Sequence, residues 1–424
     1  MGDTMDVRRT KRLDSLTGMR FVAAGLVFLS HIATGGTFAV GSTAADGLHT
    51  VTKTASTVGV SFFFVLSGFV LTWSARPGDT YTGFLRRRLV KIYPNHLVTF
   101  ALAMLLFAAA ATPPGTAVLN LLLLQAWSSD PSVYLSVNGA SWSLSCELLF
   151  YALFPLLLPL VHRIGAARLW WWAGGVAAAV MVLPLAAGLL PATPAIPETG
   201  AALDGVSFDR LWFLYVFPLS RLLDFVLGML MARIVLSGRW IGLGAGWSAL
   251  LAVAGYVLGI LTPMAFTFDA VTIVPLALLV AALAAADDAG TRTPMASRPM
   301  LLLGEASFAF YLVHGVVLTY LHDLVGAESG LALLPGVLFA LGALVVSLAL
   351  ALAMHRWIES PAVRRWGRPR RTGGPATAGP VAPAAGPVAP AAGLVAPVAG
   401  PAAPAGTVPE QRLASGEESS SAPV

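Results

Sequence analysis

Long apolar runs, separated by short polar connections, follow one another from residue 16 to residue 354 of this 424-residue chain. A helix needs about 20 apolar residues to cross the hydrocarbon core of a bilayer, which is roughly 30 Å thick. We therefore predict ten membrane-spanning helices, near residues 16–37, 56–75, 94–112, 141–161, 169–190, 211–235, 243–262, 264–286, 300–322 and 331–354. The expected fold is an all-α, polytopic bundle of about ten transmembrane helices.

One further apolar run, residues 116–127, is too short to cross comfortably. Pro113 and Pro114 precede it, and Asp130 with Pro131 follows it, so turns are expected at both ends. We interpret this run as a re-entrant or interfacial segment. If it did cross, the count would be eleven and every later span would be inverted.

The basic residues between the runs gather on one side of the ten-helix arrangement. With the N-terminus in the cytoplasm, only Lys53 and Arg210 fall in outer loops, which are otherwise acidic or neutral. Lysine and arginine are enriched in the cytoplasmic loops of membrane proteins. We therefore predict that both termini are cytoplasmic and that the chain is a multi-pass protein of the cell membrane.

The composition changes after residue 371. Residues 372–424 are rich in proline, alanine, glycine and valine, and "GPVAPAA" occurs twice, at Gly379 and Gly386. Proline at this density breaks helices, and glycine does not recur at every third position as collagen requires. The predicted organisation is a basic cytoplasmic N-terminus (1–12), a transmembrane domain (13–371) and a disordered cytoplasmic tail (372–424).

Overall composition excludes several classes of protein. Hydrophobic residues make up 57% of the chain and charged residues 11%, which is too apolar for a single soluble domain. Cys146 is the only cysteine, so no internal disulfide and no CxxC-type metal or redox site is expected. The net charge of +5 comes from basic residues in the short connections between apolar runs, as membrane orientation requires, so we expect no nucleic-acid binding. We also expect no bound metal.

Two ionisable residues mark the first predicted span, which contains "MRFVAAGLVFLSH". Arg20 and His31 are eleven residues apart, which is about 16 Å along a helix and close to a whole number of turns, so they share a face. Ionisable residues inside a span are functional-site candidates by default. A snorkelling arginine near the cytoplasmic edge and a packing histidine beyond the midplane are the structural alternatives.

Other spans contain further polar candidates. Glu147, in "WSLSCELLFY", needs a partner to remain charged when buried, and an interhelical hydrogen bond is its structural alternative. His314 lies close to Tyr311 in "SFAFYLVH". Arg221 and Asp224, three positions apart, are predicted to form a structural ion pair.

Small and basic residues complete the set of candidates. Ser67 and Gly68, in "FFFVLSGF", would allow close approach of helices, so packing is their structural alternative. The sequence "FLRRRLVKIYP" places Arg88 and Lys91 in a basic loop before the third span. Membrane orientation alone would explain these charges, but a polyanionic cytoplasmic ligand such as a coenzyme A nucleotide would also need them.

Seven segments, taken in order, resemble the membrane-bound acyltransferase family 3. They are "LTGMRFVAAGLVFLSH", "FFFVLSGF", "RRLVKIYP", "WSLSCELLFY", "SRLLDFVLG", "SFAFYLVH" and "WIESP". The resemblance covers roughly residues 12–362. It implies transfer of an acyl group, usually acetyl, from cytoplasmic acyl-coenzyme A to a hydroxyl on a sugar, glycan, lipid or secondary metabolite. Acyl-coenzyme A would be a co-substrate, with no bound cofactor.

The resemblance also implies roles for individual residues. The family's essential Arg-x10-His pair falls on Arg20 and His31, and its acidic position falls on Glu147. Its Arg-x-x-Arg motif falls on Arg88 and Lys91, where lysine keeps the charge but not the planar fork of arginine. We therefore assign catalysis to His31, Arg20 and Glu147, and substrate or acyl-coenzyme A binding to Arg88, Lys91, Ser67, Tyr311 and His314.

Acyl transfer requires a base for the acceptor hydroxyl and a site from which water is excluded. Neutral imidazole has suitable basicity, so we expect His31 to be that base, with Glu147 orienting its ring and Arg20 holding coenzyme A or supporting the site. Direct transfer and a covalent acyl-histidine both remain open. The acceptor would be a glycosylated natural product or a cell-envelope glycan.

A transporter or flippase is the main alternative function, because intramembrane charges also mark substrate and proton pathways. Inverted repeats would support it, but the two halves of the chain show no such symmetry by eye.

Overall fold

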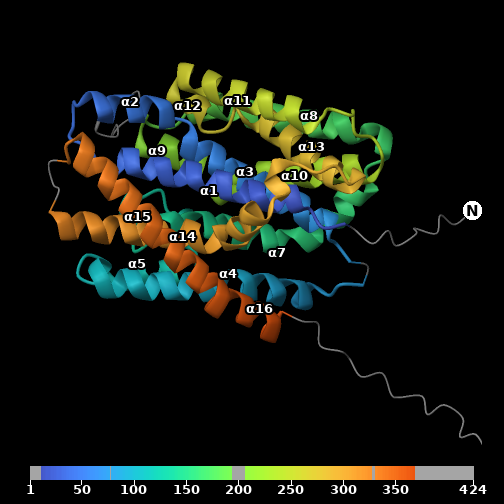
Figure 1. The fold of residues 1–424 in the computed structure, drawn as a ribbon. Coiled ribbons are helices and arrows are strands. Elements are labelled where there is room, and N and C mark those ends of the chain that lie inside the picture. Colours follow the sequence, from blue (N-terminus) through green and yellow to red (C-terminus); the bar gives the residue numbers. More distant parts are fainter. Residues whose placement is uncertain (1–10, 77, 193–205, 327–329, 368–424) are drawn as a thin grey trace, which may run out of the picture. The chain divides into compact units, whose positions relative to one another are not determined.

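The computed structural model describes residues 11–76, 78–192, 206–326 and 330–367 (Figure 1). Within these residues the regular structure is helical, apart from isolated bridge residues such as the pair Phe38 and Leu331. The predicted all-α class is therefore confirmed. The predicted tail, residues 372–424, and residues 1–10 of the predicted N-terminal segment lie outside the described residues.

Each of the ten predicted spans overlaps a helix of at least 17 residues. These helices are α1 (Asp14–Thr34), α3 (Ala55–Trp73), α4 (Tyr81–Ala103), α7 (Trp142–Arg163), α8 (Leu169–Ala187), α10 (Pro218–Leu236), α11 (Ala245–Leu261), α13 (Ile273–Ala289), α14 (Arg298–Val325) and α15 (Leu333–Met354). The shorter α-helices are α2 (Thr43–Thr52), α5 (Pro114–Leu121), α6 (Pro131–Tyr134), α9 (Phe208–Leu211), α12 (Met264–Thr267) and α16 (Ser360–Trp366).

Seven helical stretches within the described residues are long and apolar enough to cross a membrane. They are Asp14–Thr34, Thr43–Trp73, Tyr81–Ala108, Gly139–Arg163, Ala166–Ala187, Arg298–Val325 and Leu333–Trp366. The three remaining predicted spans correspond to α10, α11 and α13, which do not combine the required length with the required apolar composition. Ten crossings, with both termini in the cytoplasm, stay a prediction.

Two predicted boundaries were wrong. The basic sequence around Arg88 lies inside α4, which begins at Tyr81 and continues through Pro94, and not in a loop before it. The Thr80 side chain accepts a hydrogen bond from the backbone of Gly83 and so caps this earlier start. The predicted span 264–286 is helical throughout only from Ile273, because the four-residue α12 precedes it.

The segment predicted to be re-entrant or interfacial is short in the structure. Helix α5 contains eight residues and is followed by a single 3₁₀ turn, Gln125–Trp127. Eight helical residues rise about 12 Å, which is far less than the thickness of the bilayer core. The segment therefore does not cross as a helix.

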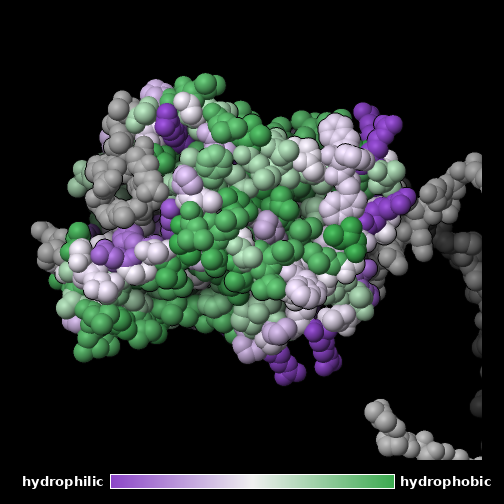
Figure 2. Space-filling view, turned by 90° about the horizontal axis from the view of Figure 1, so that it is seen from above, coloured by the Kyte–Doolittle hydropathy of each residue, from purple (hydrophilic) through white to green (hydrophobic). Residues whose placement is uncertain are grey.

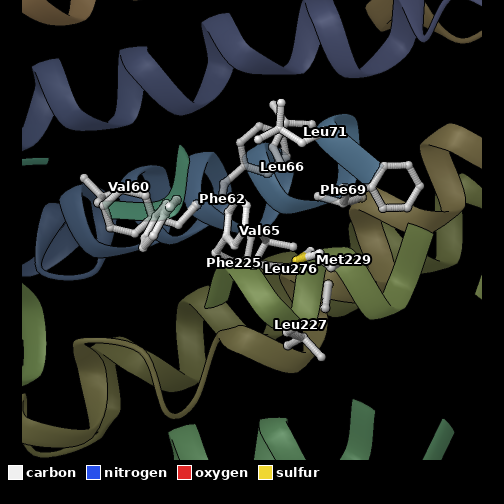
Figure 3. Packing of buried hydrophobic residues seen from close by; sticks show 14 of the residues in the cluster. Val60, Phe62, Val65, Leu66, Phe69, Leu71, Phe225, Leu227, Met229 and Leu276 are labelled. Atoms are coloured by element: carbon white, nitrogen blue, oxygen red, sulfur yellow. The ribbon is translucent and has the colours of Figure 1, made fainter. Parts of the chain in front are cut away.

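Helix α3 lies at the centre of the packing and contacts α1, α10 and α13. Side chains from α3 and α10, including Val65, Phe225 and Met229, meet in the core that Figure 3 shows. Gly68 and Gly228 allow this contact, because a Cβ atom at Gly68 would lie 1.9 Å from the Phe225 carbonyl oxygen and one at Gly228 would lie 2.0 Å from that of Val65. Gly68 therefore serves close packing of the helices, which was the structural alternative to a functional role.

Helix α1 also packs against α14, and α14 packs against α15. Gly304 makes the first contact close, because a Cβ atom there would lie 1.9 Å from the carbonyl oxygen of Thr17. The outer surface is apolar over much of the face shown in Figure 2, with hydrophilic side chains toward its edges. Exposed Leu105, Trp171 and Leu189 belong to this surface, as expected for residues that face lipid.

Candidate functional site

Two neighbouring cavities are lined by most of the predicted catalytic and binding residues. The larger, about 650 Å³, is lined by His31 and is called the histidine cavity here. The smaller, about 160 Å³, is lined by Arg20 and is called the arginine cavity. Val60 and Tyr311 line both cavities and form the wall between them. Arg20 and His31 share a helix face as predicted, but they open onto opposite sides of this wall.

His31 on α1 is hydrogen-bonded to His314 on α14. The distance from His31 Nδ1 to His314 Nε2 is 2.8 Å, and the two rings are stacked with centroids 5.0 Å apart. His314 is fully buried, whereas His31 is half-buried and reaches the cavity. The packing of α1 against α14 brings together the two histidines, which are 283 residues apart in the chain.

The hydrogen bonds of His314 determine how the pair is protonated. His314 Nδ1 lies 3.1 Å from the carbonyl oxygen of Phe310, which can only accept, so this nitrogen carries a proton. In a neutral His314 ring, Nε2 is then an acceptor, and His31 Nδ1 must donate to it. In a neutral His31 ring this leaves Nε2 as an unprotonated nitrogen. His31 makes no other hydrogen bond to the described residues, so that nitrogen is available to a ligand in the cavity.

Apolar rings surround the histidine pair. Phe310 stacks on His314 with centroids 5.7 Å apart, and Phe28 approaches the same ring edge-on at 6.1 Å. Both phenylalanines are buried. This surrounding keeps water away from the inner ring and leaves the pair accessible only from the side of His31.

The wall between the cavities is held by a hydrogen bond between helices α14 and α7. Tyr311 donates to Ser143 Oγ at 2.9 Å, and Ser143 donates in turn to the carbonyl oxygen of Ala140 at 3.1 Å. Phe63 packs edge-on against the Tyr311 ring with centroids 5.9 Å apart. The Tyr311 ring lies 6.0 Å from that of His314, so the wall adjoins the histidine pair.

The arginine cavity has a surplus of positive charge. Arg20 and Arg88 line it, and neither forms a hydrogen bond or an ion pair with the described residues. The Arg88 guanidinium lies over the Phe84 ring, 5.4 Å from its centroid, while its Nε is buried without a partner. Unpaired guanidinium groups that face a cavity are suited to an anionic ligand.

Lys91 lines the same cavity but has a partner. Its Nζ is hydrogen-bonded to Glu359, and Asn95 Nδ2 donates to the other oxygen of that carboxylate at 2.8 Å. Glu359 is 1% exposed and lies in the "WIESP" motif that follows α15. Glu359 therefore holds Lys91 beside Arg88, a contact that the sequence reading did not include.

A third cavity, about 320 Å³, continues from the arginine cavity and is called the basic groove here. The two share Leu71, Arg88 and Lys91. The basic groove adds Arg76 and Arg87, the latter paired with Asp79. Arg87, Arg88 and Lys91 lie on α4, and Arg76 precedes it.

Glu147 lies away from His31. It lines the arginine cavity with Ser67, and its carboxylate accepts a hydrogen bond from Tyr151, four residues later on α7. The expected contact with the His31 ring is therefore wrong, because His314 occupies that position. The partner of Glu147 comes from its own helix and not from a neighbouring one, so the alternative of an interhelical bond is also not observed.

Arg221 and Asp224 form a buried ion pair of 2.6 Å, and the structure adds a third charge. Arg221 Nη1 lies 3.1 Å from Asp269 Oδ2, and its Nη2 donates to Ser61 Oγ at 2.6 Å. Each of the three charged side chains is at most 7% exposed. Asp269 was not predicted because it is far from the pair in sequence and lies outside any regular helix.

No group of three or more histidine, cysteine, aspartate or glutamate side chains suited to a metal ion occurs among the described residues. Two polar residues of the histidine cavity, Tyr134 and Asn138, were also absent from the predicted set. Tyr134 ends the four-residue helix α6 and Asn138 follows in irregular structure before α7, so neither belongs to a helix long enough for its periodicity to distinguish a cavity-lining position from an exposed one.

Comparison with known proteins identifies relatives across most of the chain. The family profile described as "Acyltransferase domain" matches residues 13–356. Acyltransferase MdmB of Streptomyces mycarofaciens is 44% identical over 374 residues, which cover 85% of this chain and 94% of the relative. Exopolysaccharide production protein ExoZ of Rhizobium meliloti (strain 1021) is 30% identical over 329 residues, covering 75% and 92%. No solved structure matches.

Proposed function

The chain belongs to acyltransferase family 3 and is an acyltransferase, and from this premise we propose that it transfers an acyl group, acetyl in particular, from acyl-coenzyme A to a hydroxyl of a sugar-containing acceptor. This membership removes the support for a transporter or flippase without acyl transfer. The main observation in favour is that His31 faces a cavity large enough for a small-molecule ligand, with one ring nitrogen left unbonded. The acceptor would be a glycosylated natural product or a cell-envelope glycan, and the membrane would be the cell membrane.

The arginine cavity and the basic groove would bind the donor. The arginine cavity is too small for a whole coenzyme A molecule, so the thioester arm would occupy it while the nucleotide lies in the basic groove. Arg20 and Arg88 offer unpaired guanidinium groups to the phosphates or to the thioester carbonyl. Lys91, already bonded to Glu359, would contribute less.

The histidine pair would perform the proton transfer. His31 Nε2 removes the proton of the acceptor hydroxyl as its oxygen attacks the thioester carbonyl. The tetrahedral intermediate then expels the coenzyme A thiolate, which takes the proton from His31. While His31 is protonated, its Nδ1–H donates to the neutral His314 Nε2, a hydrogen bond that the added charge strengthens. His314 would therefore have the orienting role first assigned to Glu147.

The wall at Tyr311 would separate donor from acceptor until the reaction. In the orientation predicted from the basic residues, the arginine cavity faces the cytoplasm and the histidine cavity faces the other side. The acceptor would then enter from the side opposite to acyl-coenzyme A. Movement of the Tyr311 ring away from Ser143 would bring the thioester to His31.

Purified protein in lipid nanodiscs, given radiolabelled acetyl-coenzyme A and candidate acceptors, tests this proposal. We expect acceptor-dependent release of coenzyme A and labelled acceptor, and His31→Ala should abolish both while leaving expression and insertion intact. Substantial activity in this variant would contradict the assignment of the base. Label that stays on the quenched protein until acceptor is added would indicate an acyl-histidine in place of direct transfer.

A further inference from the structure

Two buried polar atoms in the wall of the histidine cavity have no hydrogen-bond partner among the described residues. They are Tyr134 Oη and Asn138 Oδ1. Their side chains are only 1% and 3% exposed. Buried polar atoms are nearly always hydrogen-bonded, and an unsatisfied one destabilises the protein. Both residues line the cavity, so a small shift of either side chain would bring its polar atom to a polar ligand there, which would supply the missing bond.

Asn138 is held next to the histidine pair. Its Nδ2 donates to the carbonyl oxygen of Leu312 at 3.0 Å. Its Oδ1 would lie 3.3 Å from a Cβ atom at Gly315, which has none and also lines the cavity. Leu312 and Gly315 are three positions apart and share a face of α14, so Asn138 packs against the same turn of helix that carries His314.

The segment that carries both residues is fixed in place. Ser141 Oγ donates to the carbonyl oxygen of Asn138 at 2.7 Å, and Asn120 Nδ2 donates to that of Ser136 at 2.7 Å. Val137, between them, has a φ of 60°, a conformation that β-branched residues rarely adopt. Such a conformation persists only where the surroundings enforce it, and it is typical of functional sites.

The two atoms differ in what they require of a ligand. Asn138 Oδ1 can only accept, so it needs an O–H or N–H group. Burial, together with the carboxylates of Asp130 and Asp209, raises the pKa of Tyr134 to about 12, so its hydroxyl remains protonated near neutral pH. Tyr134 can therefore both donate and accept. Hydroxyl groups, which do both, match this pair.

We propose that Tyr134 and Asn138 form the acceptor-recognition subsite, which binds hydroxyls of a polyhydroxylated ring other than the one that receives the acyl group. The proposal rests on the acyltransferase function proposed above, because it takes the histidine cavity as the acceptor site. A ring with a single hydroxyl would leave at least one of the two buried atoms unsatisfied when its own hydroxyl faces His31. The enzyme would therefore select sugars over simple alcohols of similar size.

Direct binding to the full chain in nanodiscs tests this subsite without any need for turnover. The probes are methyl β-D-glucopyranoside and cyclohexanol, measured by saturation-transfer NMR. We expect wild-type protein to bind the glycoside more tightly than cyclohexanol. Tyr134→Phe should weaken glycoside binding by roughly 10- to 100-fold, the effect of removing one buried hydrogen-bonding group. The matched control is Tyr320→Phe, because Tyr320 is 38% exposed and does not line the cavity.

A variant that keeps the Asn138 side chain is needed, since Asn138→Leu also removes the bond to Leu312. Gly315→Ala places a methyl group against Asn138 Oδ1 and blocks it without deleting the side chain. We expect this variant to lose glycoside binding by at least about tenfold, with a smaller loss for cyclohexanol and with acetyl-coenzyme A binding unchanged.

Equal binding of the two probes by wild-type protein, or glycoside affinity unchanged in both Tyr134→Phe and Gly315→Ala, would overturn the subsite. Thiol release separates this result from the proposed function. If the variants lose the glycoside but wild-type protein releases no coenzyme A with any acceptor, the acyltransfer mechanism fails and the subsite stands. If wild-type protein acylates acceptors while the variants bind the glycoside normally, the subsite fails and the acyltransfer function stands.

Discussion

Arg20 and Arg221 are both arginines in predicted membrane spans, but their surroundings differ. Arg221 is 1% exposed and is bonded to Asp224, Asp269 and Ser61. Arg20 is half-buried, faces a cavity and has no hydrogen bond or ion pair among the described residues. Position in a span therefore does not separate a structural charge from a functional one. The presence or absence of protein partners does, since a charge that is satisfied by the protein has little left to offer a ligand.

Removing the structural arginine should have the largest effect. Arg221→Leu leaves two buried carboxylates without their cation, which is expected to lower the free energy of unfolding by about 3–5 kcal/mol. Thermal unfolding in detergent micelles, with folded yield as a second measure, checks this. The control replaces Arg221, Asp224 and Asp269 together by leucine and should recover most of the loss, because no unpaired charge remains. If the triple variant is as unstable as Arg221→Leu, then these three side chains stabilise the protein by more than neutralising one another.

Replacing Arg20, which lines the arginine cavity, should lower enzymatic activity without lowering the stability of the protein. Arg20→Ala is expected to lower kcat/KM for acetyl-coenzyme A by about 100-fold, the effect of truncating one partner of a buried charge pair. Its unfolding temperature should stay close to that of wild-type protein, because no hydrogen bond or ion pair of Arg20 with the described residues is lost. If Arg20→Ala instead unfolds as readily as Arg221→Leu and retains its kcat/KM, Arg20 and Arg221 belong to the same structural class.

Arg88 and Lys91 differ in the same way as Arg20 and Arg221, because only Lys91 is paired with a carboxylate. Arg88→Ala should raise KM for acetyl-coenzyme A by about tenfold, because its guanidinium has no hydrogen bond or ion pair among the described residues. Lys91→Ala should raise it by less, because the charge of Lys91 is already shared with Glu359. Initial rates across a range of acetyl-coenzyme A concentrations measure both. A larger effect at Lys91 than at Arg88 would contradict the rule that unpaired cations bind the donor.

The smallest effect is expected for Arg20→Lys, which changes the shape of the cationic group but not its charge. Arg20→Lys keeps the charge but loses the planar fork that bonds two oxygens at once, so kcat/KM should fall by about threefold to fivefold. Comparison with Arg20→Ala under the same conditions separates charge from geometry. A loss equal to that of Arg20→Ala would mean that bidentate geometry, and not charge, is what the ligand requires.

Most of the helices could be predicted from the sequence, because an apolar run of sufficient length has one main outcome in a bilayer. The local ion pair of Arg221 with Asp224 was also within reach, since residues three apart on a helix are neighbours. The bond between His31 and His314 was not, because it depends on how two distant helices pack. Both histidines were singled out from the sequence, but only the packing of α1 against α14 identifies them as a pair.

Glu147 shows a different reason for error. The sequence places Tyr151 four positions later, a spacing at which helical side chains meet, and this is the contact observed. The distant partner His31 was expected because of its chemistry, although a local partner was available. Tyr134 and Asn138 could not be predicted, because positive φ at Val137 and the absence of a helical repeat leave no pattern to interpret.

The thin wall of Val60 and Tyr311 has an electrical consequence. If both cavities fill with water, most of the membrane voltage falls across these two side chains, and moving one elementary charge through them involves about 2.3 kcal/mol per 100 mV. In the proposed reaction an acylium equivalent moves outward as the proton of the acceptor moves inward, so no net charge is displaced. The turnover would then be insensitive to voltage, and the energised state of the cell would neither drive it nor be drained by it.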